Sequence, residues 1–265
     1  MKDIFLNLVS SWWGILIICL VVFVLLFILS MAFYRQFFKR FYDIVLCGIA
    51  IVVFSPIFLI LIILGAIKMR GNPFFFQFRP GRVDKKTGEE KIFKLIKFRT
   101  MTNAKDKDGK LLPDDQRLTK YGKILRSTSL DELPELLNMF AGHMSIVGPR
   151  PQLVRDMVFM SEKQRERHSV RPGLTGLAQC SGRNNMTWEK RFEYDLEYVE
   201  KITLFGDLKI LFKTVISVFR REGINEEGMA TAMDFGDYLL QAGKVEKAEY
   251  DEKQAKAKEL IEKVK

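Results

Sequence analysis

The segment from Arg126 to Leu136 reads RSTSLDELPEL, and it places three carboxylates within five positions shortly after an arginine. Ser129 and Glu132 match the S-x-x-E capping box, in which a hydroxyl and a carboxylate satisfy unpaired backbone amides at a helix start. Alternatively, Asp131 is a nucleophile or a metal ligand, because an arginine and a helix N-terminus keep a nearby carboxylate ionised. Carboxylates can attack phosphorus and form acyl phosphates. The two interpretations are compatible, and the rest of the chain has to decide between them.

The composition narrows the classes of function. The 265-residue chain has a formal net charge of +10, which suggests nucleic acid, anionic lipid or a phosphorylated substrate as a partner. Cys19, Cys47 and Cys180 form no C-x-x-C pair, so the sequence argues against a disulfide framework or a zinc site. His143 and His168 are far apart in the sequence, and nothing supports a Ser-His-Asp triad. The chain also contains neither a P-loop nor a G-x-G-x-x-G dinucleotide motif.

The N-terminal region is strongly apolar and carries no charge from Ile4 to Tyr34. This run exceeds the roughly 20 residues that a helix needs to cross a bilayer. A cleaved signal peptide is the alternative, with Ser30-Met31-Ala32 as a loose cleavage site, but the run is too long and a second apolar run follows it. Basic residues from Arg35 onward place the C-terminal end of the run in the cytoplasm. We therefore expect a transmembrane helix within residues 1–35.

A second uncharged run extends from Ile44 to Ile67 and carries Ser55-Pro56 near its centre. Both of its flanks are basic, so a simple crossing would leave one basic flank outside. A helix broken at Ser55-Pro56 would instead enter the membrane and return to the same side, because proline removes a backbone hydrogen bond and serine can help to satisfy the freed carbonyls. A kinked helix that spans the bilayer is equally compatible with the residues alone.

Residues 73–98 and the Pro149-Arg150-Pro151 unit each carry a local structural signal. Short apolar segments over residues 73–78 and 91–98, joined by a turn-rich segment, predict a β-hairpin. Pro149 and Pro151 fix the backbone on both sides of Arg150, which suits a phosphate clamp, although a plain turn has the same pattern.

The rest of the chain reads as helical. The patterns predict a short helix over Leu118–Arg126, a charged surface helix over Gln152–Arg167, and a further helix over Trp188–Lys201. Leu204–Arg221 is amphipathic and basic, so it lies in the membrane interface or packs on the core. The Lys/Glu/Ala-rich tail after Ala242 is helical or partly disordered.

Several short motifs, taken together and in order, resemble those of the bacterial sugar transferases. These are monotopic polyprenyl-phosphate phosphoglycosyl transferases, and the chain is most similar to their small PglC-like type. The resemblance spans roughly Phe38 to Asp234. Its motifs are KRFYD (39–43), FSP (54–56), QFRPG (77–81), KFRTM (97–101), RSTSLDELP (126–134), VGPRP (147–151), RPGLTG (171–176) and GRN (182–184).

The resemblance implies a phosphoryl transfer reaction. Members of this family move a sugar 1-phosphate from a UDP-sugar to undecaprenyl phosphate and release UMP. By this resemblance, Asp131 would attack the sugar-linked β-phosphate, expel UMP and pass the phosphosugar to the lipid phosphate. Glu132 completes the family's Asp-Glu dyad and would bind Mg²⁺ or help to activate the acceptor. Lys97, Arg126 and Arg150 match family positions around the phosphates. Such a reaction needs positioning and positive charge more than acid–base residues.

The resemblance also implies a location and two further sets of residues. Asp195 matches another acidic site position, and Ser55 and Pro56 match the break of the family's re-entrant helix, which favours the re-entrant form. The expected location is the bacterial inner membrane, with the catalytic domain on the cytoplasmic face and in contact with membrane lipids. The helix within 1–35 and the tail at 241–265 lie outside the resemblance. The first of these strengthens the anchoring or binds a partner glycosyltransferase.

These inferences predict a mainly α-helical monotopic membrane protein with a small β-hairpin. Its expected parts are an N-terminal transmembrane helix (1–35), a re-entrant helix broken at Ser55-Pro56 (36–70), a cytoplasmic catalytic domain (71–240) and a charged tail (241–265). A non-catalytic membrane adaptor is the main alternative, and the intact Asp131-Glu132 pair argues against it. A nucleic-acid binder lacks any known motif. By the resemblance, the PglC-like size and the stretch from Gly223 to Asp237 favour an N-acetylated amino sugar, such as diacetylated bacillosamine, in the donor.

Overall fold

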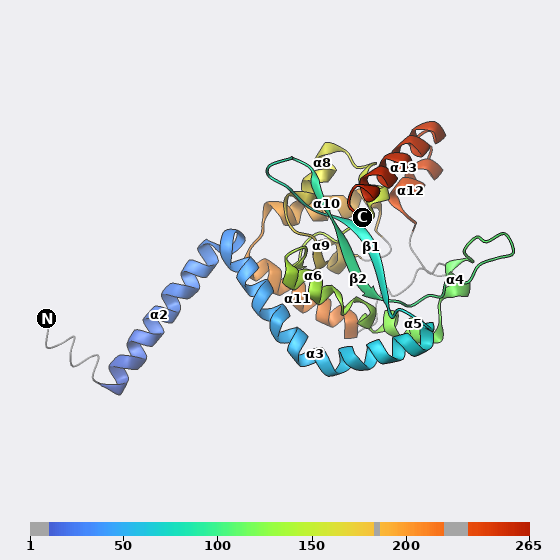
Figure 1. Cartoon of the computed structure of the whole chain (residues 1–265). Coiled ribbons are helices and arrows are strands. Elements are labelled where there is room, and N and C mark those ends of the chain that lie inside the picture. The colour runs from blue at the N-terminus through green and yellow to red at the C-terminus, as the bar shows by residue number, and fades with distance from the viewer. Residues whose placement is uncertain (1–10, 183–185, 220–232) are drawn as a thin grey trace.

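A computed structural model describes residues 11–182, 186–219 and 233–265 of the chain. It is mainly helical with two small β-sheets, which confirms the predicted fold class (Figure 1). The start of the predicted N-terminal helix, residues 183–185 of the GRN motif, and residues 220–232 lie outside the described residues. The last of these ranges holds the end of the predicted amphipathic helix and most of the stretch on which the sugar prediction rests.

The first described helix, α2 (Trp12–Ala32), projects away from the rest of the molecule (Figure 1). It begins at Ser11, whose hydroxyl accepts a hydrogen bond from the amide of Gly14 at 3.0 Å. At about 1.5 Å per residue its 21 residues are roughly 30 Å long, which matches the hydrocarbon thickness of a bilayer. Its apolar side chains are exposed on all sides. By length and composition, α2 is therefore able to cross a membrane.

The second apolar segment forms one continuous helix. The predicted interruption of the helix at Ser55-Pro56 is therefore wrong. A π-helical turn, η1 (Tyr34–Phe38), leads into α3 (Lys39–Met69), which contains Pro56. Pro56 has no amide hydrogen for the carbonyl of Val52, and the Ser55 hydroxyl donates to that carbonyl instead, at 2.7 Å. The serine thus replaces the missing bond, and the helix bends without interruption as it curves around the globular part (Figure 1).

Both halves of α3 contact the same globular body. Near its start, the carboxylate of Asp43 accepts a hydrogen bond from the amide of Ile146 at 3.0 Å. Near its end, the hydroxyl of Tyr121 donates to the carbonyl of Leu61 at 3.2 Å. The two ends of α3 therefore lie against one body, which is the arrangement that a re-entrant helix requires. Entry into a membrane remains a prediction.

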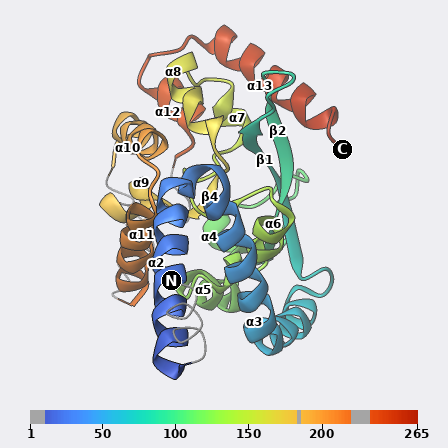
Figure 2. The same ribbon diagram turned by 90° about the vertical axis from the view of Figure 1, so that its left-hand side faces the viewer.

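The predicted hairpin is present and is longer than expected. Strands β1 (Phe74–Val83) and β2 (Glu90–Phe98) pair antiparallel, with Phe74 opposite Phe98 and an irregularity between Pro80 and Val83. Figure 2 shows this hairpin along one edge of the molecule, with α10 and α11 along the opposite edge. Phe93 and Leu95 point into a core with Cys47 of α3. The hairpin is thereby fixed against α3.

A second, two-stranded sheet lies at the centre. Strand β3 (Ser145–Val147) pairs parallel with β4 (Gly173–Thr175). The helices between and after the strands are α4 (Asp114–Arg117), α5 (Lys120–Ser127), η2 (Leu130–Glu132), α6 (Glu135–Ala141), α7 (Val154–Met157), α8 (Glu162–Arg165), η3 (Glu166–Ser169), α9 (Leu177–Ser181), α10 (Trp188–Glu200), α11 (Leu204–Phe219), α12 (Phe235–Gln241) and α13 (Lys247–Glu262). The short β3 leads directly into the Pro149-Arg150-Pro151 unit.

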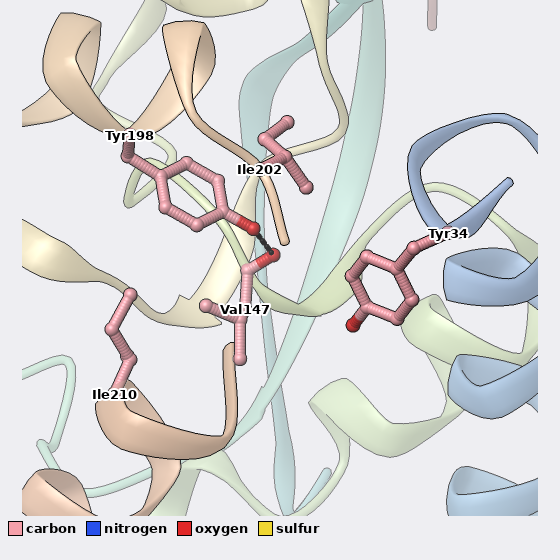
Figure 3. Packing of buried hydrophobic residues seen from close by; sticks show 5 residues of the cluster. All are labelled: Tyr34, Val147, Tyr198, Ile202 and Ile210. Carbon is pink, nitrogen blue, oxygen red and sulfur yellow. Dashed lines mark hydrogen bonds between the residues drawn. The ribbon is translucent and has the colours of Figure 1, made fainter. Parts of the chain in front are cut away.

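A buried cluster joins the start of α3 to the central sheet. Tyr34 packs with Val147 of β3, Tyr198 of α10 and two isoleucines, Ile202 and Ile210 (Figure 3). The hydroxyl of Tyr198 lies 3.0 Å from the carbonyl oxygen of Val147 and 2.9 Å from Asp207 Oδ1. The other oxygen of Asp207 accepts hydrogen bonds from Tyr34 at 2.7 Å and from Lys39 at 2.5 Å. The junction of the two apolar helices is thus tied to β3.

The predicted surface helix over Gln152–Arg167 is wrong. The segment forms α7, a bend, α8 with a capping box between Ser161 and Gln164, and the 3₁₀ turn η3. Arg167 is only 1% exposed, because it reaches inward to a buried carboxylate on α10. A single straight helix could not place both this arginine and Val154 in the interior.

The C-terminal tail is helical, which was one of the two predicted alternatives beside partial disorder. Ala257 of α13 is buried against Val154 and Met157 of α7, and Phe78 and Ile92 of the hairpin pack on the same cluster. Because α13 covers the hairpin and α7, the tail is part of the folded body rather than a free extension.

Candidate active site

The DE pair lies in the reversal between α5 and α6. Ser129 has a φ of 56°, in the left-handed region, and its side chain makes no capping bond. The predicted capping box is therefore wrong, because the positive φ turns Ser129 away from the helix start. Asp131 and Glu132 form the 3₁₀ turn η2, and α6 begins only after Pro134, which lacks an amide hydrogen to continue the preceding turn.

Two cations hold the carboxylate of Glu132. Lys97 Nζ and Arg150 Nη2 each donate to Glu132 Oε1 at 2.6 Å. Lys97 Nζ also lies 3.1 Å from Oε1 of Glu135, whose side chain is only 2% exposed. The structure thus brings together residues from β2, from η2 and from the loop after β3. Glu135 was missed as a site residue, although it belongs to the same acidic stretch, because its pattern is also that of an ordinary first helical turn.

The electrostatic balance differs between Glu132 and Glu135. Burial alone would raise the pKa of Glu132, but Arg150 and Lys97 more than offset it, so this pKa lies well below its usual range. Burial also raises the pKa of Glu135, and there Lys97 and Arg150 do not reverse the shift. Glu132 is consequently the ionised partner that holds Arg150 in place, and its charge in turn raises the pKa of that guanidinium.

Asp131, Glu132, Glu135, Lys97, Arg126 and Arg150 form one charged cluster, the Asp131 cluster, in which Asp131 is the carboxylate without a partner among the described residues. Within the described part of the chain, no hydrogen bond or ion pair holds it, so both of its oxygens are available. The pKa of Asp131 is raised, mainly by burial. Lys97 opposes this shift, and the charge of Glu132 adds to it. Arg126 and Arg150 also lower this pKa, so all three predicted phosphate-binding cations act on this one group. A raised pKa makes the ionised carboxylate a stronger nucleophile.

Arg126 reaches the cluster from the last turn of α5. Its Nε donates to Thr100 Oγ1 at 3.2 Å, and one of its terminal nitrogens lies 3.7 Å from the sulfur of Met101. Thr100 and Met101 belong to the segment that follows Lys97 on β2. The KFRTM and RSTSLDELP motifs therefore meet in space, and the predicted grouping of Lys97, Arg126 and Arg150 near Asp131 is what the structure describes.

The backbone around Arg150 is held on both sides by buried guanidinium groups. Arg167 Nη2 donates to the carbonyl of Arg150 at 2.6 Å, and Arg79 Nη1 donates to the carbonyl of Pro151 at 3.0 Å. The amide of Gly173 donates to the carbonyl of Pro149 at 2.9 Å. This is more than a plain turn requires. Neither Arg79 nor Arg167 was predicted as a site residue, and the only signal for Arg79 was its place in the QFRPG motif.

Asp195 does not join the Asp131 cluster directly. Its Oδ2 accepts hydrogen bonds from Arg167 at 2.9 and 2.7 Å, and the pair is almost fully buried. Burial raises the pKa of Asp195, and Arg167 lowers it. Asp195 therefore supports Arg167, which supports the backbone of Arg150, so the predicted site position lies behind the cluster.

An apolar pocket lies next to the charged cluster. It has a volume of about 110 Å³ and is lined by Ile51, Phe54, Ser55 and Phe58 of α3 and by Leu136 and Leu137 of α6. Leu136 directly follows Glu135, so the pocket begins within one helical turn of the Lys97–Glu135 pair. Of the two predicted residues at the helix bend, Ser55 lines this pocket.

The donor groups of the cluster are compatible with magnesium. Among residues 11–182, 186–219 and 233–265, no three His, Cys, Asp or Glu side chains are arranged to hold a metal ion by themselves. Mg²⁺ does not need such a group, because it keeps several waters and binds through one or two carboxylates plus substrate phosphates. The two oxygens of Asp131 and the remaining oxygen of Glu132 fit that pattern.

Comparisons with known proteins identify the family of this chain. The profile of a family described as bacterial sugar transferase matches residues 34–221. The chain is 45% identical over 197 residues to the uncharacterized sugar transferase EpsL of Bacillus subtilis strain 168, covering 74% of this chain and 95% of that protein. It is 36% identical over 202 residues to the exopolysaccharide production protein ExoY of Rhizobium meliloti strain 1021, covering 70% and 87%.

A larger relative is similar over part of its length. The UDP-glucose:undecaprenyl-phosphate glucose-1-phosphate transferase of Klebsiella pneumoniae is 40% identical over 197 residues, which cover 69% of this chain and 40% of that protein. The family match begins at η1 and ends two residues after Phe219 of α11, so it contains every residue of the Asp131 cluster. The chain therefore belongs to the bacterial sugar transferase family.

Proposed function

We propose that this protein transfers a sugar 1-phosphate from a UDP-sugar to undecaprenyl phosphate and releases UMP. The observation that carries the proposal is the Asp131 carboxylate beside Lys97, Arg126 and Arg150, which has no hydrogen bond or ion pair to any residue that the structure describes. The names of relatives support the same reaction. The Klebsiella relative is a glucose-1-phosphate transferase, and a Salmonella typhimurium relative is named undecaprenyl-phosphate galactose phosphotransferase.

The proposed course has two displacements at one phosphorus atom. In the first, an oxygen of Asp131 attacks the β-phosphorus of the donor, the bond to the bridging oxygen breaks, and UMP leaves with the electron pair. This gives an acyl phosphate that joins Asp131 to the sugar 1-phosphate. In the second, an oxygen of the lipid phosphate attacks the same phosphorus. The bond to Asp131 then breaks, which restores the carboxylate and forms a lipid diphosphate sugar.

The cations around Asp131 have distinct proposed roles. Arg150 presents its guanidinium from a backbone held by Arg167 and Arg79, so it stabilises charge on the phosphoryl oxygens without reorganising. Lys97 and Arg126 complete the positive surface on which the diphosphate lies. Glu132 keeps Lys97 and Arg150 oriented. A magnesium ion bound through Asp131 or Glu132 would neutralise the diphosphate of the donor.

The membrane arrangement is proposed on the same basis. The lipid phosphate would lie at the cations, with the first part of the hydrocarbon chain in the apolar pocket between α3 and α6. Membrane lipids would surround α2 and the bend of α3, and the described body would face the cytoplasm of a bacterial inner membrane. The donor sugar stays open, and an N-acetylated amino sugar remains the prediction from sequence.

The reaction is tested by measuring UMP release. The full chain in lipid nanodiscs would be given undecaprenyl phosphate, Mg²⁺ and a panel of UDP-sugars. Asp131→Asn would be assayed beside Asp115→Asn, which removes an exposed carboxylate from the short helix α4. We expect release with one donor, lost in Asp131→Asn and kept in Asp115→Asn. No release with any donor would contradict the proposal and favour a non-catalytic adaptor, whereas equal release by Asp131→Asn would contradict the covalent course.

A further inference from the structure

A second cavity lies away from the Asp131 cluster. It has a volume of about 300 Å³ and is formed by the turn end of the β1–β2 hairpin together with the loop after α6 and Arg171. Lys91 of its wall and Lys97 of the cluster lie on the same strand six residues apart, which corresponds to about 20 Å. The cavity is therefore a separate place on the molecule, and the proposed reaction makes no use of it.

The wall of this cavity carries a large excess of positive charge. Its charged residues are Arg82, Lys85, Lys86, Lys91 and Arg171, with Asp84 as the single carboxylate. Asp84 lies 3.0 Å from Lys91. Within the described ranges of the chain, the four other cations form no ion pair. Like charges gathered around one hollow repel one another, and an anion in the hollow would remove that repulsion.

A hydrogen bond to the backbone holds Arg171 in the wall of this cavity. Its Nε donates to the carbonyl of Gly142 at 2.9 Å, which leaves the terminal nitrogens of the fork for another partner. Burial lowers the pKa of this guanidinium, the nearby Arg82 and Arg40 lower it further, and Asp43 opposes them without reversing the shift. Arg171 is thus half-buried beside two other arginines, without a carboxylate hydrogen-bonded to it in the part of the chain that the structure describes.

The backbone preserves the shape of the cavity. Gly142 has a φ of 91°, and a Cβ there would lie 3.0 Å from a terminal nitrogen of Arg40. A Cβ on Gly81 would lie 2.7 Å from the carbonyl oxygen of Lys91. The rings of Phe93 and His143 stack with centroids 5.6 Å apart and form part of the wall. Side chains at either glycine would force the walls to move.

We propose that this cavity is a second phosphate-binding site, which takes a phosphate-bearing ligand with at least two negative charges. An arginine fork together with several lysines is the usual protein surface for phosphate. The phosphate has two sources. Arg40, in the first turn of α3, is close to the expected membrane surface, so an anionic lipid headgroup is one source, and a soluble diphosphate compound is the other.

The test compares two triple variants that each remove three positive charges. The cavity variant is Arg82→Gln/Lys85→Gln/Lys86→Gln. The control variant is Lys105→Gln/Lys107→Gln/Lys110→Gln, in another loop. All six side chains are exposed, so both variants should fold, and equal melting temperatures would verify this. Binding of inorganic pyrophosphate to the full chain would be measured by calorimetry in phosphatidylcholine nanodiscs. The Asp131 cluster is intact in both variants, so any difference reports on the cavity.

We expect the control variant to bind pyrophosphate at one site more than the cavity variant, or the cavity variant to bind at least tenfold more weakly at that site. Equal binding by the two variants would overturn the proposal. A repeat in nanodiscs that contain phosphatidic acid, whose phosphomonoester headgroup can carry two negative charges, separates the sources. Loss of only the cavity-dependent binding identifies a lipid headgroup, and its persistence identifies a soluble ligand. Arg171→Lys, which keeps the charge but removes the fork, should also weaken this binding. None of these outcomes depends on whether the protein releases UMP.

Discussion

Arg167 donates a hydrogen bond from Nη2 to the backbone carbonyl of Arg150 at 2.6 Å, although the two residues are 17 positions apart. The same guanidinium is held by Asp195, and both side chains are almost fully buried. The direction of Arg150 is therefore set by a buried ion pair that does not touch Asp131. A phosphoryl-transfer site gains from such rigidity, because its catalysis rests on cations that are already in position.

Removing the charge of Asp195 should destabilise the protein strongly. Asp195→Asn leaves Arg167 buried without a carboxylate, and breaking a buried pair costs about 3–5 kcal/mol. We expect a melting temperature lower by several degrees in detergent, together with a lower kcat/KM in the molecules that remain folded. Glu193→Gln is the control on the same helix, because among the described residues Glu193 pairs only with the exposed Lys190. Equal melting curves for the two variants would contradict this account.

The Tyr198 hydroxyl should also contribute measurably to stability. It lies between the carbonyl of Val147 and the carboxylate of Asp207 in the buried cluster of Figure 3. Tyr198→Phe leaves a buried acceptor without its donor, which costs about 1–3 kcal/mol. Tyr194→Phe serves as the control, since the Tyr194 hydroxyl makes no hydrogen bond to the described residues. Thermal unfolding should separate the two variants, and a Tyr198→Phe protein as stable as Tyr194→Phe would refute the role of this hydroxyl.

The pH dependence of the reaction should follow Asp131. Its pKa is raised, so the nucleophilic carboxylate is lost as the pH falls through a value above the ordinary aspartate pKa of about 3.9. Glu132, whose pKa is lowered, should add no limb in that range. We expect the acidic limb of kcat/KM to lie above pH 3.9 in folded protein. Arg150→Gln should move the limb to higher pH, because Arg150 favours the ionised form; a limb that moves to lower pH would be inconsistent with this assignment.

The two ends of α3 should face the same side of the membrane. Cysteines would be introduced at Arg35 and at Asn72 in a chain from which Cys19, Cys47 and Cys180 have been removed. A membrane-impermeant maleimide should then label both positions in inside-out vesicles and neither in right-side-out vesicles, because both ends of α3 contact one body. Labelling of the two positions from opposite sides would establish a helix that crosses the bilayer.

The sequence predicted the elements whose signals are local. The hairpin, the N-terminal helix and the short helix before Ser127 follow from patterns within a few residues, and the structure contains all three. Ser55 could be assigned to help the freed carbonyl because proline has a fixed effect on a helix. The resemblance to a family brought Lys97, Arg126 and Arg150 together with Asp131, and the structure has the same grouping.

The errors arose where distant residues decide the local structure. Ser129 satisfies the capping-box pattern, but its positive φ and the following Pro134 delay the helix to Glu135. The charged pattern up to Arg167 is that of an exposed helix. Arg167 is nevertheless buried, because it pairs with the carboxylate of Asp195, 28 positions later in the sequence. Glu135 and Arg79 lie within the acidic stretch and the QFRPG motif, but neither pattern predicts their contacts. These contacts depend on how β1 and β2 lie against the loop after β3.

The covalent intermediate is tested most directly by detecting the phosphosugar on Asp131. The protein would be incubated with its UDP-sugar donor in the absence of lipid acceptor, quenched, and measured by intact-protein mass spectrometry. We predict a mass increase equal to one sugar phosphate, which proteolysis locates on the peptide that contains Asp131. This adduct should be absent from Asp131→Asn, and undecaprenyl phosphate should discharge it. An active protein that shows no such adduct, or the same adduct on Asp131→Asn, would contradict this prediction.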